Sequence, residues 1–352
     1  MQRPDLSHVD PEIVAYIEYL EAQLKGYTPR RNVIQPKEIE EYAAEPAGPA
    51  EQPTTINIAT ISQAGIAKRT PRHLYPRQHR GGMGIFDLDV PTPDFPAILT
   101  SLDASDNVLV FTNQAKVYRV PANRLGDSEV RSKGILLFDR YEMDAGEMPV
   151  TVLPERSSGY VALASSLGKV RCLRHHLFGE HMRPGSLFFN TKDTGPLAAA
   201  CWTEGDSDLF LLTQKGIAIR FSEKALSPMG DWGIKVASDD RVVAITSVYP
   251  DGLVFMIGVE GKGTIREMAG FAPNKSSGGS GKIAIKNEHL VGATSVTPND
   301  DLFILTRLGK IIRFRADEVP STDGVVQGVI CVNMRNDEVV AVTASGAGGN
   351  RP

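Results

Sequence analysis

The sequence predicts an all-β fold, a six-bladed β-propeller made of four-stranded repeats. Three observations lead to this prediction. A strand–turn–strand pattern recurs six times at intervals of about 48 residues, a period typical of propellers. A second glycine follows each turn at a nearly constant distance. No helical periodicity separates the strands, which excludes a doubly wound α/β fold. The 352 residues therefore contain one ring of repeats rather than two or three unrelated domains.

The first recurring feature is a turn between an apolar strand and a basic strand. Thr or Ser opens it in most copies, and Ala takes the glycine place in the second copy. The flanking strands are rich in β-branched residues and are bounded by Gly, Asn and Asp, as short strands usually are. The turn residues, spaced by 50, 53, 48, 47 and 46 positions, are Gly65, Ala115, Gly168, Gly216, Gly263 and Gly309.

The second recurring feature is a glycine that opens another strand 17–19 residues after the turn. These glycines are Gly84, Gly134, Gly185, Gly233, Gly281 and Gly328. Each copy then has room for four strands, which in the fourth copy are expected at Leu209–Thr213, Gly216–Phe221, Gly233–Val236 and Val242–Val248. Closure of such repeats into a ring leaves few free sheet edges.

The predicted ring spans residues 55–345, and three segments lie outside it. Residues 1–27 are expected to form a helical head, residues 28–54 an acidic linker, and residues 346–352 a flexible tail. The linker is rich in Pro, Ala and Glu, a composition that favours a flexible chain.

A single helix is predicted over residues 10–27 of the head. Asp10 can cap it and Pro11 suits its first position. Its apolar residues follow alternating spacings of four and three, an a/d seam of about two heptads. Such a helix can dock on its own domain, bind a partner or mediate self-association, and the sequence leaves these alternatives open.

The charge is distributed unevenly. The net charge is −4, which taken alone argues against a nucleic-acid partner. Residues 1–54 carry ten acidic and five basic residues, whereas residues 55–85 carry five basic residues and no acidic one. Because nucleic-acid binding depends on the charge of one surface rather than on the sum, the ring remains a candidate for DNA binding.

Basic residues follow the turn in every repeat. Equivalent positions in a closed ring face equivalent directions, so these residues are expected to form a basic band that binds DNA. An alternative is that they only protect edge strands from aggregation. The candidate DNA-binding residues of the band are Lys68, Arg69, Lys116, Arg119, Lys169, Arg171, Lys215, Arg220, Lys262, Arg266, Lys310 and Arg313.

A glycine-rich heptapeptide, Gln78-His79-Arg80-Gly81-Gly82-Met83-Gly84, lies at the second glycine of the most basic repeat. Adjacent glycines allow a phosphate to approach backbone N–H groups. Nearby Arg72 and Arg77, together with Arg80, supply positive charge. The segment adds eight candidate DNA-binding residues: Arg72, Arg77, Gln78, His79, Arg80, Gly81, Gly82 and Gly84.

The heptapeptide resembles the box Gln-Arg-Arg-Gly-Gly-Lys-Gly of the C-terminal domain of DNA gyrase A. The six repeats resemble that domain's six-bladed β-pinwheel, and the box lies in the first blade, as it does in the family. The resemblance covers about residues 55–345. It implies a module that binds duplex DNA on its rim without sequence specificity and wraps it, which lets a type II topoisomerase supercoil DNA.

The sequence departs from the family at His79, where the box has Arg, and at Met83, where it has Lys. Two permanent charges are missing, so wrapping is expected to be weaker or sensitive to pH. The stretch before residue 55 is too short for the family's cleavage core. The expectation is a non-catalytic part, not an enzyme by itself, that acts with a separately encoded topoisomerase core.

Other functions receive less support from the sequence. A propeller that binds an acidic protein partner is the main alternative. Cys172 with His175, His176 and His181 does not match a zinc-binding spacing, so neither a metal nor a cofactor is expected. The chain has no apolar run long enough for a membrane span, and its three cysteines are odd in number. We therefore expect a cytoplasmic, nucleoid-associated protein.

Overall fold

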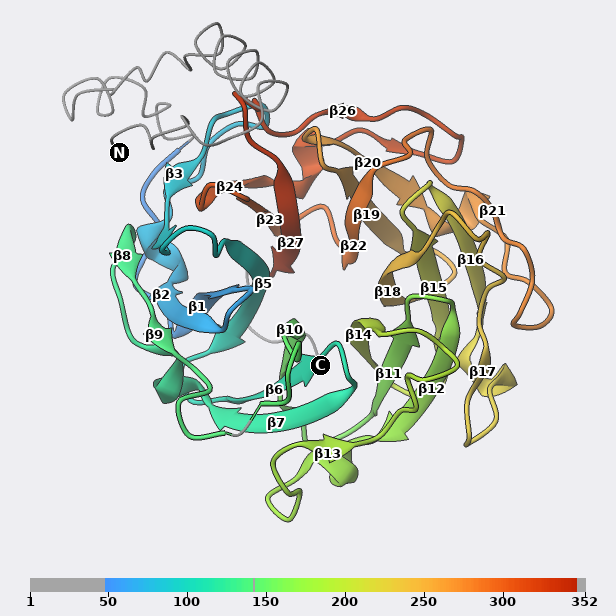
Figure 1. Cartoon of the computed structure of the whole chain (residues 1–352). Helices are drawn as coiled ribbons and strands as arrows, with labels where there is room; N and C mark the ends of the chain where they lie inside the picture. The colour runs from blue at the N-terminus through green and yellow to red at the C-terminus, as the bar shows by residue number, and fades with distance from the viewer. Residues whose placement is uncertain (1–47, 142, 347–352) are drawn as a thin grey trace, which may run out of the picture. The chain divides into compact units, whose positions relative to one another are not determined.

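The computed structural model describes residues 48–141 and 143–346, which form a ring of six sheets around a central channel (Figure 1). The predicted six-bladed propeller is confirmed. The predicted helix over 10–27, most of the predicted linker and nearly all of the predicted tail lie outside the described residues. Within the described ranges the helices are short 3-10 turns that follow the hairpins: η1 (Arg72–Leu74), η2 (Ala122–Leu125), η3 (His175–Phe178), η4 (Glu223–Ala225), η5 (Met268–Gly270) and η6 (Ala316–Glu318).

Each blade is built on an antiparallel hairpin of two strands. From the first blade to the sixth, the hairpins are β1 (Ile56–Ser62) with β2 (Ile66–Pro71), β6 (Asn107–Thr112) with β7 (Lys116–Pro121), β11 (Tyr160–Ser165) with β12 (Lys169–Arg174), β15 (Asp208–Thr213) with β16 (Ile217–Ser222), β19 (Leu253–Gly258) with β20 (Lys262–Glu267), and β23 (Asp301–Thr306) with β24 (Lys310–Arg315).

The innermost strand of each blade pairs with the first strand of its own hairpin and faces the channel. In the same order these strands are β5 (Pro96–Asp103), β10 (Pro149–Pro154), β14 (Leu197–Thr203), β18 (Val242–Val248), β22 (Leu290–Val296) and β27 (Val339–Ser345).

The outermost strand of each blade is only two residues long and comes from the following repeat. These strands are β9 (Ile135–Leu136), β13 (Ser186–Leu187), β17 (Asp231–Trp232), β21 (Lys282–Ile283), β26 (Val329–Ile330) and β3 (Ile85–Phe86). The fifth blade also holds β25 (Ser321–Thr322), and β4 (Leu88–Asp89) pairs with β8 (Ser132–Lys133) between neighbouring repeats.

This exchange corrects the expected third strand of the fourth copy. The expected strand at Gly233–Val236 is replaced by β17, Asp231–Trp232, which pairs with β12 of the third blade. The glycine equivalent to Gly84 is accordingly Gly230, which has a φ of +81°, and not Gly233. Each repeat thus completes the blade before it.

The same exchange closes the ring. The first repeat has no preceding blade, and its outer strand β3 pairs with β24 of the last hairpin, with Phe86 opposite Lys310 and Ile85 opposite Ile311. An apolar cluster joins the same two blades, because Ile58 and Tyr75 pack with Phe303 and Leu305. The first and sixth blades therefore meet along both a sheet and a core.

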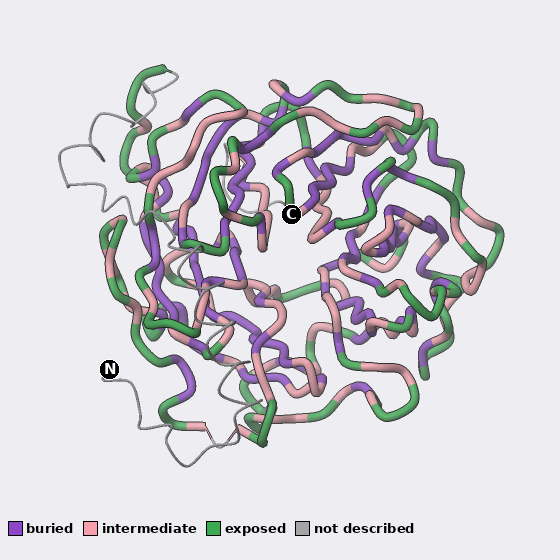
Figure 2. Tube along the Cα trace, turned by 45° about the horizontal axis from the view of Figure 1, so that its top comes forward, coloured by how far each residue is buried: buried purple, intermediate pink, exposed green. Residues whose placement is uncertain are grey.

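The core lies between the blades. Six clusters of buried apolar side chains fill the six boundaries, and Figure 2 shows buried segments (purple) distributed around the ring. Because the hairpin strands are covered on both faces, they carry near-continuous apolar runs such as Val108–Phe111. Burial of this kind is the main source of the ring's stability.

The hairpin turns share one backbone conformation. The turn residue has a positive φ in each copy: +88° at Gly65, +95° at Gly168, +78° at Gly216 and +81° at Gly309. In the fifth copy the equivalent is Gly261, at +77°, so the expected turn residue Gly263 is shifted by two positions. Ala115 occupies this place in the second copy with a φ of +60°, a region that costs a residue with a Cβ atom energy.

We predict that Ala115→Gly stabilises the protein by about 1 kcal/mol, because glycine adopts a positive φ without strain. The converse substitution Gly216→Ala places a Cβ 2.4 Å from the carbonyl oxygen of Ile285 and should destabilise the protein. Urea denaturation measures both. A lower denaturation midpoint for Ala115→Gly would contradict the prediction.

Candidate nucleic-acid interface

The heptapeptide 78–84 lies on the seam between the first and the sixth blade. The backbone N–H of Gln78 donates to the carbonyl of Arg313 at 2.7 Å, and the N–H of Gly81 donates to the carbonyl of Cys331 at 2.7 Å. β3 follows directly and completes the sixth blade. The segment is therefore part of the ring closure.

The glycines of the heptapeptide serve close packing. A Cβ on Gly82 would lie 2.5 Å from Oε1 of Gln78, and one on Gly84 would lie 2.7 Å from the carbonyl oxygen of Ile311. The expected open N–H groups are already bonded, since Gly81 donates across the seam and Gly82 donates to the carbonyl of His79 at 3.2 Å. Gln78 is buried, and its Oε1 accepts from the N–H of Gly84 at 3.3 Å.

The heptapeptide exposes the side chains of His79 and Arg80, and Glu318 contacts the ring of the first and the backbone of the second. Oε2 of Glu318 accepts from the backbone N–H of Arg80 at 2.9 Å and lies 3.2 Å from Nδ1 of His79. The Arg80 guanidinium donates to the carbonyl of Ile330 at 3.1 Å. Arg77 pairs with Asp301 at 3.0 Å. The carboxylate of Glu318 is itself an anion, and it already accepts the backbone N–H of Arg80 that a DNA phosphate would otherwise contact.

Four arginines of the predicted band share one register but point into the structure. Arg69, Arg119, Arg220 and Arg313 each occupy the third pair of their hairpin. Arg220 pairs with Asp208 at 2.7 Å and donates to the carbonyls of Met268 and Phe271 at η5 of the next blade. Arg119 pairs with Glu155 at 2.9 Å and Arg69 with Asp127 at 3.6 Å. Their charges are used in ion pairs and contacts between blades.

Arg313 makes the same contacts at the seam. It pairs with Asp301, and its Nη1 donates to the carbonyls of Arg72 and Tyr75 at 3.1 and 3.0 Å. Glu51, at the end of the predicted linker, bridges Arg313 and Arg72. Burial acts to raise the pKa of Glu51, but the two arginines outweigh it and hold the pKa below its usual value.

Two other arginines depart from that register. Arg266 is buried one pair away, opposite Val254, and bonds the carbonyl of Gly324. Arg171 is half-buried and donates to the carbonyls of Phe188 and Pro228 at 2.7 and 3.1 Å. The arginines of the band consequently do not share one register across the six copies.

The lysines nearest the turns lie closer to solvent. Lys116 contacts Asp144 and Glu147 at 2.7 and 3.1 Å, Lys215 pairs with Asp239, and Lys262 lies 3.8 Å from Glu260. Lys169 and Lys310 instead lie 5.9 and 5.1 Å from the ring centres of Trp232 and Phe86, distances typical of cation–π contacts.

Lys68 is fully buried, unlike the other lysines of the band. Its Nζ lies 2.7 Å from Asp87, which also accepts hydrogen bonds from Tyr75 at 2.6 Å and from Thr60 at 2.7 Å. Burial lowers the pKa of Lys68, against the attraction of Asp87. The pair fastens the segment after the heptapeptide to the first blade and does not reach the surface.

Exposed basic residues lie instead in the long segments that carry the outer strands. Sequence reasoning missed them because they follow no fixed spacing. They include Arg131, Lys133, Arg140, Arg183, Lys235, Lys275, Lys282 and Lys286.

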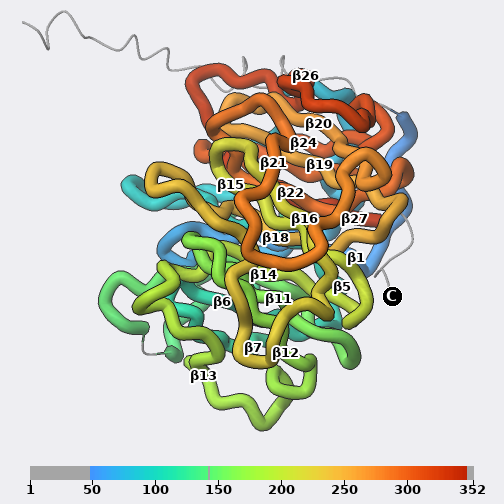
Figure 3. The backbone as a smooth tube through the Cα atoms, turned by 90° about the vertical axis from the view of Figure 1, so that its right-hand side faces the viewer, coloured from blue at the N-terminus to red at the C-terminus, as the bar shows by residue number. Residues whose placement is uncertain are grey.

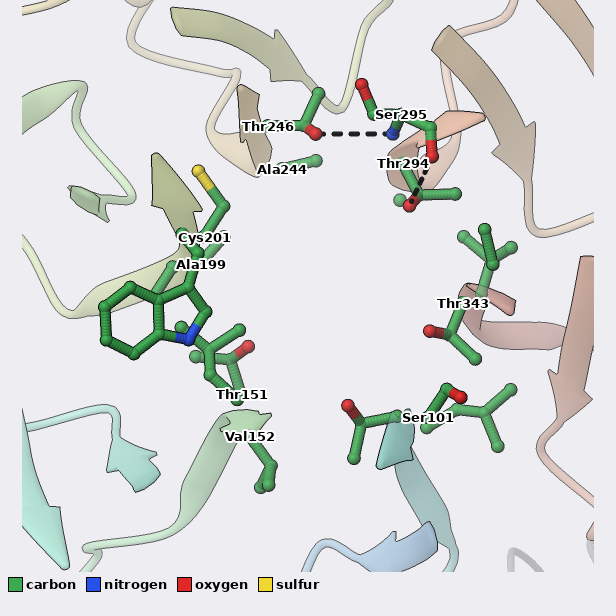
Figure 4. Close-up of a pocket in the computed structure, with 18 of the residues that line it drawn as sticks. Ser101, Thr151, Val152, Ala199, Cys201, Ala244, Thr246, Thr294, Ser295 and Thr343 are labelled. Atoms are coloured by element: carbon green, nitrogen blue, oxygen red, sulfur yellow. Dashed lines mark hydrogen bonds between the residues drawn. The ribbon is translucent and has the colours of Figure 1, made fainter. Parts of the chain in front are cut away.

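The central channel is a cavity of about 910 Å³ lined by the innermost strands. Figure 4 shows Ser101, Thr151, Thr246, Thr294 and Thr343 around its open centre, each from a different blade. Hydroxyl and aliphatic groups dominate this wall. It offers no cationic row for a phosphate backbone.

Metal and membrane sites find no support in the part of the chain that the structure describes. Burial raises the pKa of Cys172 and of Cys331 to about 12, so both stay protonated thiols. No group of three or more His, Cys, Asp or Glu side chains among the described residues could hold a metal ion. No helix in those same ranges is long and apolar enough to cross a bilayer.

Comparison with known proteins agrees with this geometry. The family model "DNA gyrase C-terminal domain, beta-propeller" matches residues 57–91, 106–133, 207–248 and 300–344, that is, the hairpins of the first, second, fourth and sixth blades. The resemblance to the C-terminal domain of DNA gyrase A is confirmed.

Individual relatives match most of the chain. The DNA gyrase A protein of Staphylococcus aureus (strain MRSA252) is 27% identical over 329 residues, and that of Staphylococcus epidermidis (strain ATCC 12228 / FDA PCI 1200) is equally similar over the same length. These matches cover 90% of the chain, which spans 37% and 36% of the length of these two gyrase A proteins.

Solved structures share the fold. A gyrase A C-terminal domain superposes with a TM-score of 0.73 at 20% identity and covers 82% of the chain and 99% of that domain. The C-terminal domain of a DNA topoisomerase IV gives a TM-score of 0.59 at 18% identity and covers 83% of the chain and 94% of that domain.

The buried pair predicts a stability effect at Asp87. Asp87→Asn leaves the Lys68 charge without its counterion and should destabilise the ring by about 3–5 kcal/mol, whereas Asp89→Asn, at an exposed position two residues later, should be neutral. Urea denaturation distinguishes them, and equal effects would contradict the role assigned to Lys68.

Lys68 should also make a contribution to stability that increases with pH in the alkaline range. The pKa of Lys68 in the folded chain lies below the ordinary value of 10.5, so between the two values the unfolded chain binds more protons. Because burial and Asp87 raise the pKa of Tyr75, this contribution of Lys68 is measured in a Tyr75→Phe background, as the difference between the pH profiles with and without the Lys68→Met/Asp87→Leu substitutions. Identical profiles of stability against pH would show that folding does not change the pKa of Lys68.

Proposed function

We propose that the ring binds duplex DNA on its perimeter without sequence specificity and wraps it, as an accessory part of a type II topoisomerase. The observation that carries the proposal is the closed six-bladed ring with the heptapeptide at its seam, in a chain that matches gyrase A proteins over 90% of its length. The comparisons give no support to the alternative of a scaffold for an acidic protein.

The contact surface proposed here is narrower than the predicted band. Lys68, Arg72, Arg220, Arg266 and Arg313 are buried, so they hold the ring together. The exposed side chains His79 and Arg80, the lysines at the turns and the basic residues of the outer segments remain as phosphate ligands.

Wrapping follows from charge and shape. Phosphate contacts around a ring bend the duplex, and bending 20–30 base pairs by 40–90° costs about 1–6 kcal/mol, which many weak contacts offset. Contacts to the backbone carry no base information, so binding is nearly blind to sequence. Acidic residues such as Glu318 lie among the basic side chains of the protein. We therefore expect a modest affinity for DNA that falls steeply with salt concentration.

The ring itself does not cleave DNA in this proposal. The cleavage core of a type II topoisomerase acts with it, and the chain would be found with DNA in the cytoplasm. The direct test adds the protein to nicked plasmid, seals the nick with ligase and measures the linking number. A shift that grows with protein concentration supports wrapping, and binding without a shift refutes it.

Arg80 should be a phosphate ligand. We predict that Arg80→Gln weakens DNA binding about three- to tenfold at low salt and reduces the slope of log K against log salt by about one. The control Arg241→Gln removes an exposed arginine next to the innermost strand β18 and should leave affinity unchanged. Fluorescence anisotropy with a labelled duplex measures both, and an equal loss would refute a specific role for Arg80.

Glu318 should oppose binding. Glu318→Gln keeps an oxygen that accepts from the Arg80 N–H but removes the negative charge, so we predict a several-fold gain in affinity at low salt that disappears at high salt. Weaker or unchanged binding of a normally folded Glu318→Gln protein would show that the carboxylate does not compete with phosphate.

A further inference from the structure

In every blade the last residue of the outer strand is a large apolar residue that lies exposed on the outer rim. These residues are Phe86, Leu136, Leu187, Trp232, Ile283 and Ile330, and 38% to 63% of each residue is exposed. We call them the perimeter row. Each lies two residues after a glycine, so the sequence pattern Gly-x-apolar marks all six once the strand exchange is known.

The residue opposite each member of the row begins the second strand of a hairpin. It is lysine in four blades and isoleucine in two: Ile66, Lys116, Lys169, Ile217, Lys262 and Lys310, from the first blade to the sixth. Directly opposed side chains lie on the same face of a sheet. Most apolar members of the row therefore have a cation beside them.

The pairs repeat with a period of three blades. Isoleucine opposes an aliphatic residue in the first and fourth blades, lysine opposes an aliphatic residue in the second and fifth, and lysine opposes an aromatic residue in the third and sixth. Three blades are half of the ring. Figure 1 accordingly shows β17 and β3 on opposite sides of the channel, and Figure 3 shows β13 and β26 at opposite edges.

The row does not contribute to the core, and its members are spaced by one blade each. Exposed apolar side chains on edge strands favour aggregation, so six of them at equivalent positions require a reason other than stability. A protein partner usually needs one contiguous apolar patch. A duplex following the rim meets isolated apolar contacts at regular intervals, with phosphates on both sides for the lysines.

We propose that the perimeter row is a set of apolar contacts to the sugars and base edges of a wrapped duplex, with Lys169–Trp232 and Lys310–Phe86 as its two strongest stations. The inference rests on the proposed DNA wrapping and adds residues to it. Where the minor groove of a bent duplex faces the protein, an apolar side chain can enter it, and the neighbouring cation neutralises the adjacent phosphates.

The two stations have different places on the DNA path. Phe86 follows the heptapeptide directly and has Arg131 5.8 Å from its ring centre, so a duplex bound at the seam reaches it at once. Trp232 ends β17, which lies half a ring away from β3 (Figure 1). Only a duplex that is long enough and bent around the rim contacts both.

Trp232 provides a direct probe of this geometry. The sequence has two tryptophans, and the other, Trp202, is buried with its Nε1 donating to the carbonyl of Pro154 at 2.7 Å. In a Trp202→Phe protein the fluorescence reports on Trp232 alone. At one duplex per protein, we expect a duplex several times longer than about 20 base pairs to quench this fluorescence, and a duplex of about 20 base pairs, which can bind at the seam without reaching Trp232, to quench it less.

Affinity variants complete the test. Trp232→Ala should weaken binding of the long duplex about three- to tenfold with an unchanged salt slope, since no charge is lost, and Trp232→Phe should restore much of it. Tyr249→Ala is the matched control, because Tyr249 is an aromatic residue of similar exposure, 49% against 46%, beside the channel. Circular dichroism verifies that each variant is folded.

The outcomes separate this inference from the proposed function. Salt-dependent binding with no quenching and no effect of Trp232→Ala overturns the perimeter row and leaves DNA binding intact. Equal losses for Trp232→Ala and Tyr249→Ala also overturn it. Absence of salt-dependent binding by the unaltered protein refutes the proposed function and the row together.

Discussion

The ring depends on the contacts that join its last hairpin to its first. Arg313 is at their centre, because one guanidinium pairs with Asp301 and Glu51 and donates to two carbonyls of the first blade. Arg220 makes a comparable set of contacts between the fourth and fifth blades. A buried arginine is costly unless every donor is satisfied, and here the carbonyls of a 3-10 turn and an acidic residue satisfy it. Positive charge that looks available for DNA in the sequence thereby stabilises boundaries between blades.

The repeat, the strand order of each hairpin and the number of blades could be predicted from the sequence, because turn glycines and apolar runs recur in step. The hairpin with which each short outer strand pairs could not be predicted. Two residues such as Asp231–Trp232 carry no periodicity, and their partner β12 belongs to another repeat. Burial of Lys68 was equally inaccessible, since its partner Asp87 is identified only when the chain after the heptapeptide returns to the first blade.

At the candidate site, too, the sequence predicts the position of the segment but not its contacts. The sequence locates the heptapeptide correctly, but its glycines serve packing against Gln78 and Ile311, and its N–H groups are occupied. Spacing cannot show whether a glycine makes room for a ligand or for the protein's own backbone. Nor could it reveal Glu318, which is 238 residues away from Arg80 in the chain and in contact with it in the ring.

The seam differs from the other boundaries in how the chain crosses it. Between the first and second blades a short connection links β5 to β6 beside the channel, whereas β27 and β1 have no such link. At the seam the part of the chain that the structure describes crosses on the outer side, through the heptapeptide and β3. In mechanical terms the ring is open at the seam on its inner side, and the chain connects the two blades at the outer edge. Tension applied along the rim loads that outer connection. Among the described residues, the inner side of the seam is held only by non-covalent contacts, such as the 3.0 Å hydrogen bond between Ser101 of β5 and Ser345 of β27, and it parts first.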